Sequence, residues 1–354
     1  MLTNLKTFYL KNFEKIIFSL ILISIFGSAK AHYNLTQQPL IQSHFKNEII
    51  KTPKQWITSS KTLANIYKNR TINIGFNEAS FPFSYRSLTG KPNGYAYDIA
   101  LAIKEEIEHI LAIPIMVTAV RLDYDERIYR MKSQLIQIEC GSTSQTIERQ
   151  KHALFSPAFY IAHVRMAVRD SSNINNLNDL KNKNIALEKG THAANIIEKL
   201  NKQHNLAFHL FKYDTTNQAL ESVLARRTDA FILDDVLLSS ALTKRKYQIQ
   251  KKSKKTIGAF DNSLLINQLK VAGEAISEEK YACMTPKKDE VFNHLVSNKL
   301  KKMQSSGELL NLYNRWFLEK LPDSDMILNN QPNAQTAEII NIPQTNSNGK
   351  TVKK

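Results

Sequence analysis

Residues 135–150 read LIQIECGSTSQTIERQ and combine an apolar strand, a small polar turn and the start of a helix. The apolar residues of 135–138 favour a short strand, and Gly141 with the hydroxyl residues behind it favours a turn into a helix. The same order recurs along the chain, where short apolar strands alternate with longer helical patterns. This alternation predicts an α/β fold with mostly parallel sheets covered by helices.

The strand and helix candidates place the polar residues that could form a site. We expect strands at 71–75, 115–119, 135–138, 185–187 and 230–233, and helices at 98–111, 193–203, 217–226 and 290–306. Ligands of open α/β sheets bind beyond the carboxyl ends of the strands, so the residues that follow each strand are the candidates. The sequence contains no glycine-rich nucleotide loop and no internal repeat.

The N-terminus has the features of a secretory signal peptide. Lys6, Lys11 and Lys15 precede the apolar run 16–26, and the sequence GSAKA, rich in small residues, follows at 27–31. A membrane anchor is the alternative, but the run is shorter than the roughly 20 apolar residues of a span. We therefore predict a signal peptide over 1–31, cleavage after Ala31 and a periplasmic location.

The ends of the exported part are predicted to be irregular. Residues 32–61 are polar and form an N-terminal extension that packs loosely if at all. Residues 322–354 are rich in Asn, Gln, Thr and Pro, which predicts a disordered tail. The ordered body then runs over about 62–321, enough for two domains of ordinary size.

Charge and cysteine content limit the partners. The chain has 48 Lys and Arg against 32 Asp and Glu, a formal net charge of +16. We find no nucleic-acid motif, so the positive field would attract anionic solutes or an acidic surface, or it has no functional meaning.

Cys140 and Cys283 are the only cysteines, and an oxidising compartment favours their pairing over two free thiols. Neither has the spacing of a metal site.

Three strand ends carry groups that suit a zwitterion. Ser142, Ser144 and Arg149 could hold a carboxylate, because a helix start and a guanidinium both favour negative charge. Asp234 ends the apolar strand 230–233 and could pair with an ammonium group. The turn LEKGTH at 187–192 offers a glycine that lets backbone approach a ligand. Each of these residues, taken alone, would also fit a helix cap or a solvated charge.

Several separated blocks carry a resemblance to a known family. These are Ile74-Gly75 with 82–85, 94–98, 139–143 with 148–151, Asp234-Asp235, 281–284, and 306–308 with 315–317. In these blocks the chain resembles the periplasmic glutamate/aspartate-binding proteins of bacterial ABC importers, within the extracellular solute-binding proteins of family 3. The resemblance covers about 63–321.

The resemblance implies a type II periplasmic-binding-protein fold, two α/β lobes joined by two crossover strands and closing around a ligand. The first lobe would take 62–162 and return over 274–321, and the second would span 163–273. Cys140 and Cys283 match the disulfide of that family. The implied partners are a small amino acid and an ABC permease at the inner membrane, with no cofactor, no metal and no nucleic acid, for a protein that acts as a monomer.

The resemblance also implies roles for individual cleft residues. Ser142, Ser144 and Arg149 would hold the α-carboxylate of the ligand, and Asp234 its α-ammonium group. Thr191 would add a contact from the second lobe. Arg127 matches an arginine that grips the side-chain carboxylate in glutamate/aspartate members.

Three positions depart from the family pattern. A second side-chain arginine falls on Asn77, a serine falls on Tyr124, and a cleft histidine falls near Thr216. Loss of one cation should weaken acidic-ligand binding, because a desolvated carboxylate needs compensation. Asparagine or glutamine are therefore alternative ligands, unless Arg86 or Arg130 replaces the lost cation.

A further departure is extra length after Asp235, with basic residues at 244–246 and 251–255. We interpret it as a basic surface insertion, either a solvated face or a docking patch.

Three function classes follow. The first is a solute receptor that delivers an acidic amino acid to a permease. The second is an enzyme on the same fold, which the absence of a nucleophile and base among the candidates disfavours. The third is a sensor or surface-interaction protein that keeps the cleft.

Overall fold

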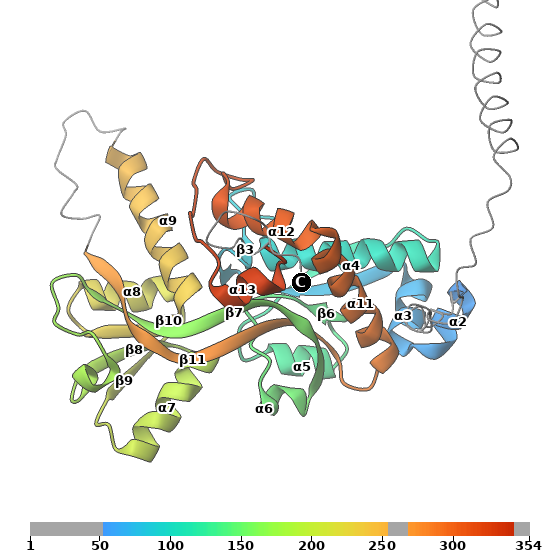
Figure 1. The fold of residues 1–354 in the computed structure, drawn as a ribbon. Helices are drawn as coiled ribbons and strands as arrows, with labels where there is room; N and C mark the ends of the chain where they lie inside the picture. Colours follow the sequence, from blue (N-terminus) through green and yellow to red (C-terminus); the bar gives the residue numbers. More distant parts are fainter. Residues whose placement is uncertain (1–51, 254–267, 343–354) are drawn as a thin grey trace, which may run out of the picture. The chain divides into compact units, whose positions relative to one another are not determined.

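The computed structural model describes residues 52–253 and 268–342, all within one compact unit of residues 51–354 (Figure 1). The predicted signal peptide, residues 32–51, the basic residues 254 and 255, and residues 343–354 lie outside the described part.

A mixed sheet with strand order β5-β1-β6-β11-β7-β10-β8-β9 runs through the described residues. Its strands are β1 (Thr71–Phe76), β5 (Met116–Arg121), β6 (Ile138–Glu139), β7 (Ala153–Arg169), β8 (Asn184–Glu188), β9 (His209–Tyr213), β10 (Ala230–Asp234) and β11 (Leu269–Pro286). A small antiparallel sheet joins β2 (Ala79–Ser80), β3 (Ser84–Arg86) and β4 (Pro92–Asn93). β1 pairs in parallel with β5 and β6, and β8 pairs in parallel with β9 and β10, which confirms the α/β prediction.

The two long strands β7 and β11 connect the halves of the sheet. They pair antiparallel with each other over most of their length, with register shifts between Ala272 and Ser277 and again near Ala282. β6 lies beside β11 on one side, and β10 lies beside β7 on the other (Figure 1). We call the half with β1, β5 and β6 the first lobe and the half with β8 to β10 the second lobe. The predicted lobe boundaries at 162/163 and 273/274 fall inside these two strands.

Helices occupy the connections between strands, as the alternation predicts. They are α2 (Pro53–Ser59), α3 (Lys61–Asn69), α4 (Tyr95–Leu111), α5 (Arg127–Lys132), α6 (Ile147–Gln150), α7 (His192–His204), α8 (Thr216–Leu224), α9 (Asp235–Ser253), α11 (Glu290–Ser306), α12 (Glu308–Tyr313) and α13 (Ala334–Ile339), with short turns of helix at Leu177–Leu180 and Asn314–Leu318. No helix of the described ranges is long and apolar enough to cross a membrane.

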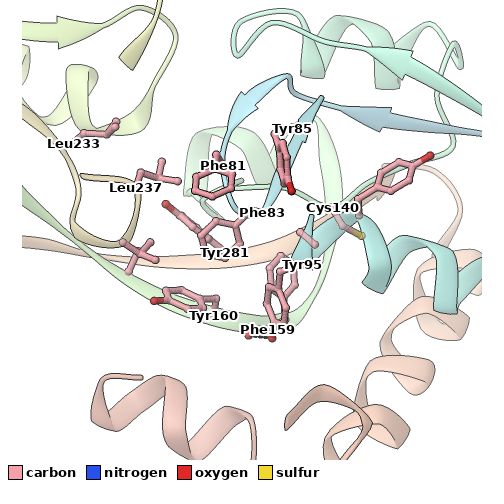
Figure 2. Packing of buried hydrophobic residues seen from close by; sticks show 14 of the residues in the cluster. Phe81, Phe83, Tyr85, Tyr95, Cys140, Phe159, Tyr160, Leu233, Leu237 and Tyr281 are labelled. Atoms are coloured by element: carbon pink, nitrogen blue, oxygen red, sulfur yellow. Dashed lines mark hydrogen bonds between the residues drawn. The ribbon is translucent and has the colours of Figure 1, made fainter. Parts of the chain in front are cut away.

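Aromatic side chains fill the core where the first lobe meets the long strands (Figure 2). The ring of Phe83 lies 4.9 Å from that of Tyr160 and 5.1 Å from that of Tyr281, both in edge-on contact. Such contacts add to the burial of large rings. The core therefore fixes the hinge strands β7 and β11 against the loop that contains Phe83.

The predicted disulfide is present. Cys140, after β6, is bonded to Cys283 of β11, and both residues are fully buried. The bond ties the segment after β6 to a hinge strand 143 residues away in the sequence.

The expectation of an irregular extension is wrong for residues 53–61. Thr52 and Gln55 form a reciprocal capping box that starts α2. Ser60 caps α3, and its hydroxyl donates to the buried carboxylate of Asp289 at 2.7 Å. The polar residues that suggested disorder are helix caps, one of which is held by a residue 229 positions away.

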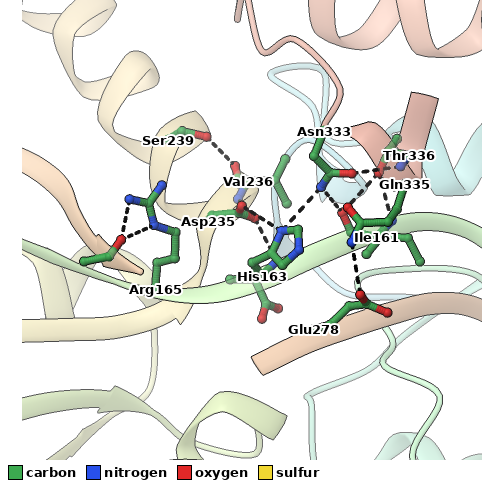
Figure 3. A network of polar contacts seen from close by, with 12 residues as sticks. Ile161, His163, Arg165, Asp235, Val236, Ser239, Glu278, Asn333, Gln335 and Thr336 are labelled. Carbon is green, nitrogen blue, oxygen red and sulfur yellow. Dashed lines mark hydrogen bonds and ion pairs between the residues drawn. The ribbon is translucent and has the colours of Figure 1, made fainter. Parts of the chain in front are cut away.

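The expectation of a disordered tail is wrong for residues 322–342. Met326, Leu328 and Ile340 are buried, although the segment is polar overall. Asn333 caps α13 and donates to the carbonyl of Ile161 at 2.7 Å (Figure 3). Polar composition predicts disorder only when the side chains find no partners, and here they bind the backbone of β7.

The basic stretch after Asp235 is helical as far as the structure describes it. Lys244 to Lys246 continue α9 without a break. The Lys244 ammonium lies 4.8 Å from the centre of the Phe81 ring of the first lobe, and burial lowers the pKa of Lys244. Lys244 is therefore not part of a solvated face, whereas Lys252, near the end of α9, is exposed.

Candidate functional site

A small cavity lies at the carboxyl ends of the strands, between the lobes. Its volume is about 240 Å³. It is lined by Tyr124, Arg127, Ser142, Ser144, Arg149, Thr191, His192, Leu233, Asp234 and Leu237. Six of the eight predicted ligand-binding residues are thus brought together from segments far apart in the sequence.

The turn after β6 brings hydroxyls to the cavity. Gly141 allows the sharp turn, because a Cβ there would come within 2.6 Å of the Glu139 carboxylate. The segment is held to hinge strand β11 by a hydrogen bond from the Ala282 N–H to the Thr143 carbonyl. Ser142 and Ser144 are both buried, and the Ser142 hydroxyl shares a 2.8 Å hydrogen bond with Ser80.

Arg149 enters the cavity from the short helix α6. Thr146 caps this helix, and an Nη1 atom of Arg149 donates to the Ser144 carbonyl at 2.9 Å. Burial, and then repulsion by Arg127, lower the pKa of Arg149 to about 10, while nearby carboxylates oppose the change. The guanidinium thus remains charged at neutral pH in a place where an anion would be favourable.

Arg127 starts α5 and is almost completely buried. Its Nε donates to the Tyr124 carbonyl at 3.0 Å, and an Nη1 atom donates to the Thr143 hydroxyl. The Thr143 hydroxyl in turn contacts the buried Glu139 carboxylate at 2.7 Å. The protein therefore already uses part of the hydrogen-bonding capacity of Arg127, and a guanidinium has five donors in all.

Asp234 is the acidic group of the cavity. Its Oδ2 accepts a hydrogen bond from the Tyr281 hydroxyl, and its buried Oδ1 accepts none from the described residues. Burial raises the pKa of Asp234 to about 7; the Tyr281 bond opposes this, and the acids Glu279 and Asp235 add to it. A buried acceptor without a partner is unfavourable, so a donor supplied by a ligand would stabilise the site.

Thr191 places the start of α7 at the cavity. Its hydroxyl caps the helix by accepting from the Ala194 N–H at 3.2 Å. Just before it, Gly190 has a φ of +72° and lies directly against the first lobe. A Cβ on Gly190 would lie 2.9 Å from the Tyr124 Cβ and from the Asp125 nitrogen. The two lobes therefore meet closely beside the cavity.

Two predicted residues, Asn77 and Thr216, do not line the cavity. The Asn77 amide donates to the Leu122 carbonyl at 3.2 Å and accepts from the Ala79 N–H at 2.7 Å, which holds the turn after β1. The Thr216 hydroxyl donates to Glu188 at 2.7 Å. Both side chains are thus occupied by contacts within the protein.

Sequence reasoning did not select three residues of this region, namely Glu188, His192 and Tyr124. Glu188 is fully buried, and burial raises its pKa to about 7, although the Thr216 hydroxyl and N–H oppose the change. His192 lines the cavity with its Nε2 3.9 Å from a Glu279 oxygen, and burial lowers its pKa. Glu188 and His192 lie in the turn LEKGTH at 187–192, so the sequence signal that could have found Glu188 is an acidic residue at the end of a strand.

No group of three or more histidine, cysteine or acidic residues suited to a metal ion occurs in the described ranges. The charged groups of the cavity are instead of opposite sign, with two arginines and one aspartate on its lining. This arrangement suits a small ligand that carries both charges.

Comparison with known proteins agrees with the fold. Residues 72–319 match the model of the bacterial extracellular solute-binding proteins, family 3. The chain is 28% identical over 286 residues to the glutamate/aspartate import solute-binding protein of Salmonella typhimurium, covering 80% of this chain and 89% of that protein.

Two solved structures share the fold at lower identity. One is an ABC uptake transporter substrate binding protein from Streptococcus pneumoniae with bound histidine, with a TM-score of 0.60, 19% identity and coverage of 72% of this chain and 96% of that one. The other is an ancestral amino acid-binding protein described as a precursor of cyclohexadienyl dehydratase, with a TM-score of 0.57, 22% identity and coverage of 72% and 99%. From the family match over most of its ordered body, the chain belongs to the bacterial extracellular solute-binding proteins of family 3.

Proposed function

We propose that the exported chain is a receptor that binds a polar amino acid, with acidic amino acids as the leading ligands, and delivers it to the permease of an ABC importer. The observation that carries the proposal is that Arg149 and Asp234, which have opposite charges, line the same cavity. An α-amino acid has a carboxylate and an ammonium group on one carbon, so it can satisfy both side chains at once.

The two ends of the ligand would be held in different ways. Arg149 would bind the α-carboxylate with two parallel hydrogen bonds, and Ser142 and Ser144 lie beside it. Asp234 would accept a hydrogen bond from the α-ammonium group through Oδ1, the oxygen that has no partner in the described residues. The ligand would thus connect the first lobe to the second.

Arg127 is the group that favours an acidic side chain. It is the second buried guanidinium on the lining, and the relative from Salmonella typhimurium is named for glutamate and aspartate import. A buried carboxylate needs such a cation. The Asn77 side chain bonds to the protein backbone and supplies no second contact to a ligand carboxylate. With one cation in place of two, asparagine and glutamine are the alternative ligands.

Two other functions are weighed against transport. For an enzyme, the cavity would need a nucleophile and a base, and in the described part of the chain no hydrogen bond joins His192 to Ser142 or Ser144. Turnover of prephenate or arogenate would reveal such an activity. A sensor would keep the cavity and signal through a partner, and genes for a permease and an ATPase beside its own would count against that role.

Export completes the proposal. A receptor for an importer acts outside the inner membrane, and the basic, apolar and small-residue order of 1–31 supplies the signal for export. N-terminal sequencing of the secreted protein should find His32 as the first residue. An uncleaved N-terminus would instead favour a membrane-anchored receptor.

The test is a thermal-unfolding screen of the exported chain, freed of bound ligand, against the common amino acids. A ligand at 100 times its dissociation constant should stabilise by about 2.7 kcal/mol. Arg149→Ala and Asp234→Asn should abolish the shift. Arg121→Ala and Asp214→Asn, which alter exposed charges outside the cavity, are the matched controls and should retain it. No shift with any amino acid would refute the receptor.

A further inference from the structure

The side chain of Tyr124 occupies one wall of the cavity in a fixed position. It belongs to the segment between β5 and α5, and its hydroxyl shares a 2.8 Å hydrogen bond with Ser80. Ser80 is in turn bonded to Ser142, so the phenol group is part of a chain of hydroxyls that ends at the cavity. Burial, and then the nearby Glu188, raise the pKa of Tyr124, which keeps the hydroxyl neutral.

The ring of Tyr124 has little room to move. The Arg127 guanidinium lies 5.0 Å from the centre of the ring, and Arg127 also binds the Tyr124 carbonyl. On the other side, Gly190 of the second lobe approaches so closely that even a methyl group would lie 2.9 Å from the Tyr124 Cβ. Gly190 therefore restricts the backbone and Cβ of Tyr124, while Arg127 and Ser80 contact its ring and hydroxyl.

This placement limits the space for a ligand side chain. With its carboxylate at Arg149 and its ammonium group at Asp234, a ligand must direct its side chain into the rest of the cavity. The space inside the lining is about 240 Å³ with its opening to solvent included, so little room remains beyond the α-carboxylate and α-ammonium groups. The lining that remains consists of Tyr124 with Arg127 from the first lobe, and of the start of α7 with Leu233 and Leu237 from the second.

We propose that Tyr124 limits the length of the ligand side chain, so that the receptor prefers aspartate and asparagine over glutamate and glutamine. The inference rests on the proposed amino-acid receptor and adds the residue that sets its length limit. A rigid ring that excludes a longer side chain is a repulsive element, which is a common basis of specificity.

The expected size of the preference follows from one methylene group. An added methylene in a fitted pocket changes discrimination by about 10- to 200-fold. Because the restriction is steric, the ratio of the two dissociation constants should be similar for the acids and for the amides. A selection based on charge would separate acids from amides instead.

The experiment is calorimetric titration of the ligand-free exported chain with aspartate, glutamate, asparagine, glutamine and 2-aminoadipate. We expect affinity to fall at least tenfold from aspartate to glutamate and to fall again with 2-aminoadipate. Tyr124→Ser should remove most of the preference by admitting glutamate. Tyr124→Phe retains the ring and loses the bond to Ser80, so it should retain the preference.

The outcomes separate this inference from the proposed function. If no amino acid binds, the receptor itself is refuted, and the length limit with it. If glutamate binds as tightly as aspartate, or if a folded Tyr124→Ser protein keeps the wild-type ratio, the receptor stands and the role of Tyr124 is overturned. The series on the wild-type chain tests the length limit even if Tyr124→Ser does not fold.

Discussion

Replacing Glu188 by glutamine should stabilise the protein at and above neutral pH, and the effect should shrink as the pH falls from 7 toward 4.5. Glu188 ends β8 and is fully buried, with Oε2 bound to Thr216 and with no hydrogen bond to Oε1 from the described residues. The charged and titratable groups on the elements around it are Asp234 of β10, Tyr124 of the first lobe and the ion pair of Lys189 with Asp214. The carboxylate of Asp234 disfavours a negative charge on Glu188, and the neutral hydroxyl of Tyr124 does not offset one.

The sign and the size follow from the pKa of Glu188. Burial raises this pKa to about 7, from an ordinary value of 4.5, so the folded protein holds a proton that the unfolded chain releases. The contribution of Glu188 to the free energy of unfolding is then fully present below about pH 4.5, declines between pH 4.5 and pH 7, and is constant at its lowest value above that. At 1.36 kcal/mol for each pH unit, the decline is about 3 kcal/mol. Glutamine retains an acceptor for Thr216 and has no proton to lose.

The assay is urea unfolding of the unliganded wild type and Glu188→Gln at intervals from pH 5 to pH 8.5. We expect near-equal stability at pH 5 and a gap of up to about 3 kcal/mol in favour of the variant at pH 8.5. Comparing the two proteins at each pH cancels the titration of the groups that do not interact with Glu188. Glu221→Gln, which changes an exposed carboxylate of α8, is the control and should show no such pH-dependent gap.

A gap that stays constant with pH would refute the reasoning. It would mean that Glu188 is ionised in the folded protein throughout this range, or that glutamine acts through packing alone. A variant less stable than the wild type at pH 8.5 would likewise contradict a buried carboxyl group that is unfavourable when charged.

Three further predictions concern the frame around the cavity. Replacing both Cys140 and Cys283 by serine should lower the free energy of unfolding by up to about 5 kcal/mol, the chain-entropy value for a loop of 143 residues, as measured by urea unfolding. Thr336→Val should cost about 1–3 kcal/mol, because its buried hydroxyl bonds twice to the backbone of β7; an unchanged unfolding midpoint would contradict this. Gly190→Ala should weaken ligand binding at least tenfold in calorimetry, because its methyl group would meet Tyr124 as the lobes close, and unchanged affinity would refute that contact.

The parts of the fold with a clear apolar period could be predicted from the sequence. The strand expected at 71–75 is β1, and the helix expected at 290–306 is α11 with the same ends. The strand expected at 135–138 is reduced to β6, Ile138–Glu139, because the Gln137 side chain and the Leu135 carbonyl bond to Asn73 of β1 in place of a regular strand pairing. Local patterns indicate what a segment can form, whereas pairing with neighbours decides where the element ends.

The two ends of the described part show what composition leaves out. The segments 53–61 and 322–342 are polar, and composition alone favours disorder. Their order includes long-range contacts, such as those of Asp289 with Ser60 and of Ile161 with Asn333. Contacts of this kind have no local signature in the sequence.

The candidate site divides in the same way. Arg149 and Asp234 could be predicted because opposite charges at two strand ends match the two charged groups of an amino acid. Asn77 and Thr216 were also predicted, but neither lines the cavity, because the protein uses their side chains in its own turns. Tyr124 stood out only as a departure from a family pattern, since an aromatic residue in a loop gives no sign of where its ring lies.

The cavity couples the charge of the ligand to the meeting of the lobes. Asp234 has an oxygen without a partner among the described residues and a pKa of about 7, so near neutral pH a proton compensates for part of the cost of its burial. A ligand ammonium group would take the place of that proton while its carboxylate binds Arg149 of the first lobe. The charge of Asp234 in the second lobe is then compensated by a ligand that is also bound to Arg149 in the first lobe. Ligand binding and closure of the lobes would therefore stabilise each other. The same closure brings Gly190 against Tyr124, which means that the contact that shuts the cavity also sets the length of the side chain it can hold.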